Sequence, residues 1–246
     1  RQGSKGEQVP HMALAIVRSW GLDGLAAPPV AVEVHLSGGL PSVTLVGLPD
    51  TEVKEARDRV RAAIVNSGFE FPARRITINL APADLPKESG RFDLPIALGI
   101  LAAAGQIPAD RLDSHEFAGE LSLSGELRPI RGALAMVLAA DAGERSFVLP
   151  ADSAREAALA QPDAILAAGS LLAVCSHLRG EDPLPTAAPA ARDALIDYAD
   201  LAEVRGQAQV KRALEIAAAG GHSLLMSGPP GSGKSMLAAR LPGLLP

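Results

Sequence analysis

Apolar and polar residues alternate with a period of two between residues 30 and 36, which is typical of a strand with one buried face. The apolar positions of this run are Val30, Val32, Val34 and Leu36. A second short apolar run, at 43–46, follows the turn-forming sequence Gly38-Gly39-Leu40-Pro41. The pattern therefore predicts that the two runs pair as a β-hairpin.

The apolar period changes to that of a helix after residue 50. Pro49-Asp50-Thr51 offers an N-cap, apolar residues recur at helical spacing from Val53 to Ile64, and Ser67-Gly68 ends the run. Further along, the pattern predicts strands and helices in alternation. The predicted strands are 75–80, 116–123, 146–149 and 164–168, and the predicted helices are 94–104, 130–142, 152–160 and 171–178. This order predicts an α/β fold with a sheet flanked by helices.

The chain is predicted to contain two domains. Residues 181–191 are rich in Pro, Ala and Thr, which indicates an extended linker rather than a packed element. The first domain is then 12–180 and the second 192–246. In the second domain, a helix at 207–219 and a strand at 222–226 are predicted to lead into a glycine-rich loop.

Both ends of the chain carry expectations of their own. Residues 1–11 are polar and without pattern, so we expect them to be a vector-derived leader. The run from Leu241 to Pro246 follows soon after the glycine-rich loop. We therefore expect the chain to hold only the first part of a nucleotide-binding domain.

Charge and composition narrow the classes of partner. The net charge of −5 provides no global basic field for nucleic acid, so DNA contact would need a local patch. The most apolar stretch, Leu94 to Gly105, is about a dozen residues long and too short to cross a bilayer. Cys175 is the only cysteine, which fits a reducing cytosol. We expect a cytoplasmic protein without a membrane partner.

The glycine-rich loop has the spacing of a phosphate-binding P-loop. Its residues are Gly228, Pro229, Pro230, Gly231, Ser232, Gly233, Lys234 and Ser235. Glycines at these positions let backbone amides turn towards phosphate oxygens. Lys234 is expected to reach the β- and γ-phosphates of ATP, and Ser235 to bind Mg²⁺. The predicted strand before the loop and helix after it support this interpretation.

A basic face is predicted on the helix at 53–64. Lys54, Arg57 and Arg61 share one side of this helix, and Arg74-Arg75 follows in sequence. The face is either a DNA contact or a solvated surface that Glu55 and Asp58 neutralise. The loop at 82–93 is a second candidate. It gathers the charged residues Asp84, Lys87, Glu88, Arg91 and Asp93, and it is either a binding loop or a solvated turn.

Several sequence motifs resemble those of a known family. They are Val46-Gly47-Leu48-Pro49-Asp50, Asn66-Ser67-Gly68-Phe69, Asn79-Leu80-Ala81-Pro82-Ala83-Asp84-Leu85-Pro86-Lys87, Arg91-Phe92-Asp93-Leu94-Pro95, Gly119-Glu120-Leu121, Val204-Arg205-Gly206-Gln207 and Gly220-Gly221-His222. From Met12 onward the chain resembles the magnesium-chelatase-like AAA+ ATPases of the ComM/YifB group. The resemblance implies a hexameric, ATP-driven motor for DNA branch migration in natural transformation, with single-stranded or branched DNA as partner. It also implies that Val204, Arg205 and Gly206 line the adenine pocket.

The first domain also resembles the proteolytic domain of Lon-type proteases, which is related to ribosomal S5 domains. In those proteases a serine is the nucleophile and a lysine activates it. Here Asp93 falls near the serine position and Leu134 near the lysine position, while Ser89 lacks such a base. The resemblance therefore implies a non-catalytic domain without protease activity.

The resemblance also implies that hydrolysis needs a Walker B acid, sensor residue, arginine finger and lid. None of these follows the P-loop here, so this chain by itself is not expected to hydrolyse ATP or to form a working nucleotide site. Two other functions stay open. One is a protein-remodelling ATPase of the unfoldase or chelatase type, and the other is a non-catalytic interaction module.

Overall fold

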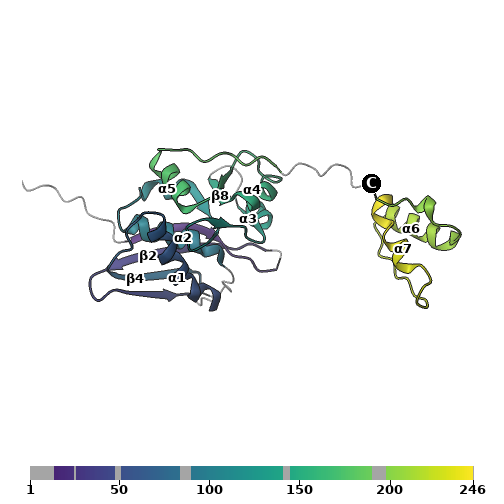
Figure 1. Cartoon of the computed structure of the whole chain (residues 1–246), viewed down its shortest axis with the longest axis horizontal. Coiled ribbons are helices and arrows are strands. Elements are labelled where there is room, and N and C mark those ends of the chain that lie inside the picture. Colours follow the sequence, from purple (N-terminus) through teal and green to yellow (C-terminus); the bar gives the residue numbers. More distant parts are fainter. Residues whose placement is uncertain are drawn as a thin grey trace, which may run out of the picture. The chain divides into compact units, whose positions relative to one another are not determined.

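The computed structural model describes residues 14–24, 26–47, 51–83, 90–140, 145–189 and 198–245, with the side chains of 51–54 left out. The chain divides into two compact units, Arg1–Ala190 and Ala191–Pro246, which are described separately below (Figure 1). Together they contain helices with both parallel and antiparallel strands, so the fold is α/β as the sequence predicts.

The first unit contains a four-stranded sheet in the order β1-β2-β4-β3. Its strands are β1 (Leu14–Trp20), β2 (Pro29–Ser37), β4 (Arg75–Ala81) and β3 (Ser42–Val46). β2 is antiparallel to both β1 and β4, whereas β3 is parallel to β4. The predicted hairpin between the runs at 30–36 and 43–46 is therefore wrong. The two strands are separated by β4, because the chain passes through α1 (Thr51–Asn66) before it returns to the sheet.

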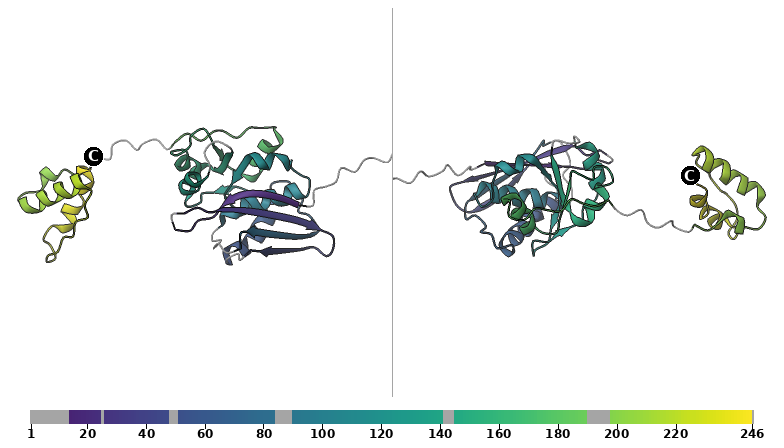
Figure 2. Two further views of the ribbon diagram at one scale, coloured as in Figure 1. Left: turned by 180° about the vertical axis from the view of Figure 1, so that it is seen from behind. Right: turned by 90° about the horizontal axis from the view of Figure 1, so that it is seen from above.

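One face of this sheet packs against α2 (Asp93–Ala103), with α1 beside it (Figure 1). The alternating residues of β2 identified in the sequence, Val30, Val32, Val34 and Leu36, are all buried in this core. α2 itself is buried along its whole length. It approaches β2 closely at Gly99, where an added Cβ would lie 2.5 Å from Val34 Cγ2. The opposite face, seen in the left view of Figure 2, carries no described helix.

A second, parallel sheet has the order β5-β8-β9. Its strands are β5 (His115–Phe117), β8 (Ser146–Pro150) and β9 (Ile165–Ala168). The strand predicted at 116–123 is divided between β5 and a short hairpin, β6 (Glu120–Leu121) with β7 (Leu127–Arg128). The Trp20 indole N–H donates to a Glu116 carboxylate oxygen at 2.7 Å and so joins β1 to β5.

Three helices accompany this second sheet: α3 (Ala133–Ala139), α4 (Ala151–Ala157) and α5 (Leu171–Arg179). Two 3₁₀ turns, η1 (Gly90–Phe92) and η2 (Asp110–Ser114), complete the first unit as described. α3 is shorter than the helix predicted at 130–142, because Gly132 takes a left-handed conformation at its N-terminus and Ala140 is already extended.

The linker predicted at 181–191 is packed in part, because residues 185–187 pair with β9. The amide of Ala167 in β9 donates to the Pro185 carbonyl at 2.9 Å, and the amide of Ala187 donates to the Ile165 carbonyl at 2.8 Å. Thr186 forms a β-bridge with Leu166, and the Ala187 side chain is buried. Proline does not prevent this pairing, because Pro185 only needs to accept a hydrogen bond.

The described part of the second unit consists of η3 (Leu201–Glu203), α6 (Ala208–Gly220), α7 (Lys234–Ala238) and η4 (Leu241–Leu244). Its core is small: Leu201, Val204, Leu214 and Leu237 are buried together. Within the described parts of both units, no helix has the length and apolar character needed to cross a membrane.

Candidate nucleotide-binding site

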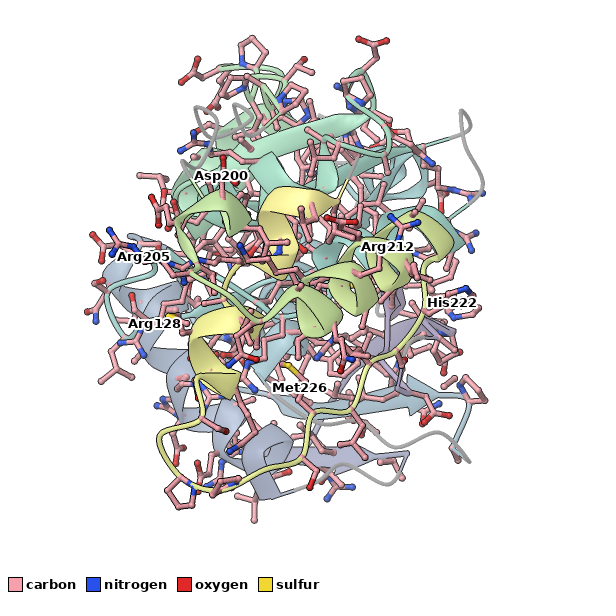
Figure 3. All side chains as sticks on the ribbon, turned by 90° about the vertical axis from the view of Figure 1, so that its right-hand side faces the viewer. Arg128, Asp200, Arg205, Arg212, His222 and Met226 are labelled. Atoms are coloured by element: carbon pink, nitrogen blue, oxygen red, sulfur yellow. The ribbon has the colours of Figure 1, made fainter. Side chains whose placement is uncertain are left out.

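The segment that enters the P-loop is extended but does not form a strand. α6 ends at Gly220, and Gly221 and His222 close it with hydrogen bonds back to Ala218 and Ala217. The strand predicted at 222–226 is absent, because the described residues 198–245 place no other strand beside it. Leu225 is consequently 92% exposed. Figure 3 shows Arg205 and His222 at opposite ends of α6, with Met226 on the segment that runs back past this helix.

The loop itself turns through two left-handed glycines. Gly231 has a φ of 82° and Gly233 a φ of 83°, a region that residues with a Cβ rarely adopt. Gly233 is also the N-cap of α7, so α7 begins at Lys234. At Gly228 an added Cβ would lie 3.2 Å from Ser232 Oγ. The glycine spacing thus produces the tight turn that the sequence predicts here.

Lys234 lies inside this turn. Its ammonium donates hydrogen bonds to the carbonyl oxygens of Gly228 at 2.7 Å and Pro229 at 2.8 Å, and to Ser232 Oγ at 3.3 Å. An ammonium has three N–H donors, and all three have an acceptor within the loop. Lys234, which the sequence predicts to be a phosphate ligand, is therefore held at the loop by the backbone that surrounds it.

Two cavities adjoin the loop, and Lys234 lines both of them. One is about 350 Å³ and is lined by Pro230, Gly231, Gly233, Lys234, Ser235 and Met236. The other is about 410 Å³ and extends between the start of α6 and residues 224–229. Ser235 lines the smaller cavity and is exposed, so its hydroxyl is accessible to a metal ion that accompanies a phosphate. Among the described residues, no acidic side chain lines either cavity.

The residues predicted to contact adenine lie beside the loop but differ in exposure. Val204 is only 3% exposed and belongs to the small core, where it joins Leu237 of α7. Arg205 is exposed, and Gly206 has a φ of 69°. None of the three lines the two cavities. The link between this segment and the loop is Gln207, whose side-chain amide donates to the Ser232 carbonyl at 3.3 Å.

Gln207 is a site residue that sequence reasoning missed. It lines the larger cavity and has a φ of 57°, an unusual value for a residue with a side chain. The motif Val204-Arg205-Gly206-Gln207 contains it, but nothing in a linear pattern shows that its side chain turns towards Ser232.

In the first unit, Asp93 is the residue that the resemblance to Lon-type proteases predicts near the nucleophile position. Its carboxylate is fully buried and accepts hydrogen bonds from Arg59 at 2.9 and 3.2 Å and from the Leu121 amide at 3.2 Å. Leu134, near the lysine position, is half-buried on α3. Ser89 and the charged loop residues Asp84, Lys87 and Glu88 lie outside the described residues. The two positions predicted from that resemblance thus carry a buried ion-paired acid and an apolar side chain.

The structure brings two of the three predicted DNA contacts together with a third arginine. Arg57 and Arg61 of α1 line a cavity that Arg74 also lines. The side chain of Lys54 lies outside the described residues. Among the residues that the structure describes, no group of three or more His, Cys, Asp or Glu side chains could hold a metal ion.

Two family models match the chain. The one described as subunit ChlI of Mg-chelatase matches residues 32–153, and the one described as magnesium chelatase, subunit ChlI, matches residues 200–246. The two matched segments together cover more than half of the chain. The second contains the whole P-loop. These two matches place the chain in the magnesium-chelatase-like class.

Individual relatives show to which group of this class the chain belongs. The uncharacterized protein YifB of Escherichia coli is 52% identical over 235 residues, which are 96% of this chain and 46% of YifB. The competence protein ComM of Haemophilus influenzae is 51% identical over 240 residues, 96% of this chain and 47% of ComM. The chain belongs to this ComM/YifB group of magnesium-chelatase-like proteins. It spans about half the length of the curated relatives it matches.

Proposed function

We propose that this chain is the part of an AAA+ ATPase that holds ATP and Mg²⁺ at the P-loop of its second unit. The observation that carries the proposal is the position of Lys234, enclosed by the backbone of Gly228 and Pro229 within a turn built on left-handed glycines. A phosphate oxygen that enters the loop replaces these carbonyl oxygens as the hydrogen-bond acceptor of the Lys234 ammonium. The match to the ChlI family over residues 200–246 supports this role.

Each loop residue has a distinct part in the proposed site. Backbone N–H groups of residues 231–233 face the phosphates, Lys234 neutralises the β- and γ-phosphates, and Ser235 provides a hydroxyl ligand for Mg²⁺. Val204, Arg205 and Gly206 lie beside the adenine, and Gln207 fixes their segment to the loop through Ser232. Because no described acid lines the two cavities, we expect this chain alone not to hydrolyse ATP.

At the level of the whole protein, we propose ATP-driven branch migration of DNA during natural transformation, performed by a cytoplasmic homo-hexamer. The name of the Haemophilus influenzae relative, competence protein ComM, supports this proposal. DNA, single-stranded or branched, is the proposed partner, with Lys54, Arg57 and Arg61 as candidate contacts. The first unit then serves assembly or DNA engagement and has no protease activity, since Asp93 and Leu134 occupy the dyad positions.

The test is the substitution Lys234→Ala in the protein at the full length of its relatives. We expect this change to abolish ATP hydrolysis, because it removes the positive charge from the β- and γ-phosphates. Lys211→Ala, on α6 of the same unit, is the matched control and should retain the parent rate. Turnover that is unchanged in Lys234→Ala would refute the assignment.

The same assay shows whether DNA or protein is the macromolecule on which the ATPase acts. ATP hydrolysis measured with single-stranded DNA, branched DNA and an unfolded protein should be stimulated by DNA and not by the protein. Stimulation by the protein alone would instead favour a protein-remodelling ATPase.

A further inference from the structure

Three arginines from two segments of the first unit line one cavity. Arg57 and Arg61 come from consecutive turns of α1, and Arg74 comes from the segment that leads into β4. The cavity is about 440 Å³, and its apolar wall includes Pro41, Phe71 and Pro72. The sequence shows Arg57 and Arg61 on one helix face, but only the fold brings Arg74 to them.

Aromatic contacts hold two arginines of this region in place. The Arg61 guanidinium lies over the Phe71 ring, 5.0 Å from its centre, and Arg179 lies over the Phe69 ring at 5.2 Å. Such stacking restricts a long side chain, so less conformational entropy is lost when its N–H groups bind an anion. The segment 69–74 is therefore flanked by partly ordered guanidinium groups.

A second cavity adjoins the first. It is about 450 Å³ and shares Pro72, Ala73 and Arg74 with its neighbour, so Arg74 stands between the two. We call the two cavities with Arg57, Arg61, Arg74 and Phe71 the arginine groove. Two adjoining cavities with the Arg74 side chain between them fit a ligand made of repeated units that are linked by anionic groups.

Two acids moderate the charge of the arginine groove. Asp58 lines the first cavity and pairs with Arg57 at 3.3 Å, but these side chains are 78% and 52% exposed. Pairs this exposed contribute little and exchange readily with other anions. Glu70 lines the second cavity. Three arginines against one aspartate leave the first cavity basic.

The chemistry of the walls selects the ligand. Guanidinium groups bind phosphate oxygens through several N–H donors, while proline and phenylalanine surfaces accommodate sugars and bases. Duplex DNA keeps its bases stacked inside and presents phosphates on a convex surface, so it cannot place a nucleoside unit in a hollow of this size. A single strand exposes both groups together.

We propose that the arginine groove binds the backbone of single-stranded nucleic acid, an inference that rests on the proposed DNA-processing function. Arg57 and Arg74 contact phosphates directly. Arg61, stacked on Phe71, offers its remaining guanidinium surface to phosphate or base.

The test is the double substitution Arg57→Gln and Arg74→Gln in this chain, which leaves the stacking of Arg61 on Phe71 in place. Binding of a fluorescein-labelled oligothymidine is followed by anisotropy at several salt concentrations. We expect the affinity to fall on the order of tenfold. The slope of log K against log salt should become shallower by about 0.7 for each phosphate that the variant no longer binds.

The matched control is Arg131→Gln with Arg155→Gln, two exposed arginines outside the groove whose removal changes the net charge equally. It should bind nearly as the parent does. A groove variant indistinguishable from this control would overturn the inference and leave the proposed function intact, since other residues would then contact DNA. Binding of duplex as tight as that of oligothymidine would also overturn it.

Failure of the proposed function gives a different result. Unchanged ATP hydrolysis in Lys234→Ala would refute the ATPase site while the groove variant still bound oligothymidine more weakly than the parent. If the parent chain did not bind oligothymidine at all, the arginine groove would be refuted whatever the result at Lys234.

Discussion

At the scale of one residue, Asp93 shows how the first unit holds a buried acid. Its carboxyl group is buried at the start of α2, and burial raises its pKa from 3.8 to about 6, against the opposing effect of its hydrogen bonds and ion pair with Arg59. The Arg59 guanidinium pKa is raised in turn, first by the hydrogen bond to Asp93. The pair connects α1 to α2, and the Leu121 amide adds the β6 hairpin to the same carboxylate.

This raised pKa predicts an unusual pH dependence of stability. Between pH 3.8 and about 6 the folded state binds more protons at Asp93 than the unfolded state, so this residue's contribution to stability is lost as the pH rises. The amide introduced by Asp93→Asn does not titrate. Relative to that variant, the parent should therefore lose up to about 3 kcal/mol of unfolding free energy across this window.

Urea denaturation of parent and variant at several pH values measures that difference. Asp163→Asn, at an exposed position in the same unit, is the control and should follow the parent at every pH. Parallel curves for the parent and Asp93→Asn would show that the buried carboxyl does not have a raised pKa.

At the scale of elements, two histidines fasten the segment at 184–187 to the first unit. The Leu184 amide donates to His177 Nδ1 at 3.0 Å, so this nitrogen carries no proton. The proton of the His177 ring is therefore on Nε2, which donates to His115 Nε2 at 3.1 Å. The His115 Nδ1–H then donates to the Arg111 carbonyl at 2.9 Å. This order of donors requires both rings to be neutral. Burial lowers the pKa of each histidine, and the positive charge of Arg111 lowers both further.

Acid should therefore loosen this segment. Because both folded pKa values lie below 6.5, the unfolded state binds more protons below that pH, and the stabilisation is complete above it and declines as pH falls. A proton on His177 Nδ1 would face the Leu184 N–H. Hydrogen exchange of the Leu184 and Ala187 amides, corrected for intrinsic rates, should lose protection as the pH falls below 6.5.

The control amide for this experiment is that of Ala118, which bonds to the Val148 carbonyl in the same unit without a histidine. Its protection should change less than that of Leu184. Equal changes at all three amides would indicate global destabilisation and contradict a local role for the histidine pair.

Elements also show where sequence patterns succeed. Local periodicity and caps predict the positions of seven elements: α1, α2, β4, β8, β9, α5 and α6. β1 was missed, because Leu14 and Ile16 on its outer face are apolar and 47% exposed, which hides the alternation with buried Ala15 and Val17. The hairpin prediction failed for another reason. Two strands that follow one another along the chain have the same sequence pattern in both cases: when they pair directly, and when a third strand lies between them in the sheet.

At the scale of the whole molecule, the P-loop lies in a unit with few buried residues. Its core joins Leu201, Val204, Leu214 and Leu237, and the segment before the loop has no strand beside it in the described residues 198–245. Nucleotide affinity depends on contacts held in place before binding, so a loosely supported loop should bind weakly. We expect calorimetric titration of this chain with Mg-ATP to show no binding in the micromolar range.

The protein at its relatives' full length is the positive control for this titration and should bind Mg-ATP under the same conditions. Tight, stoichiometric binding by this chain would show instead that residues 198–245 complete a working site on their own.

The sequence by itself determined the features that depend on neighbouring residues: the helix periods, the glycine turn at 228–233 and the lysine that follows it. The tertiary structure alone decided which distant groups meet. It placed β4 between β2 and β3, packed residues 184–187 on β9, joined Gln207 to Ser232, and brought Arg74 to Arg57. The reason is physical. Backbone conformation follows from local sterics and hydrogen bonding, whereas strand order and side-chain encounters follow from how the whole core is buried.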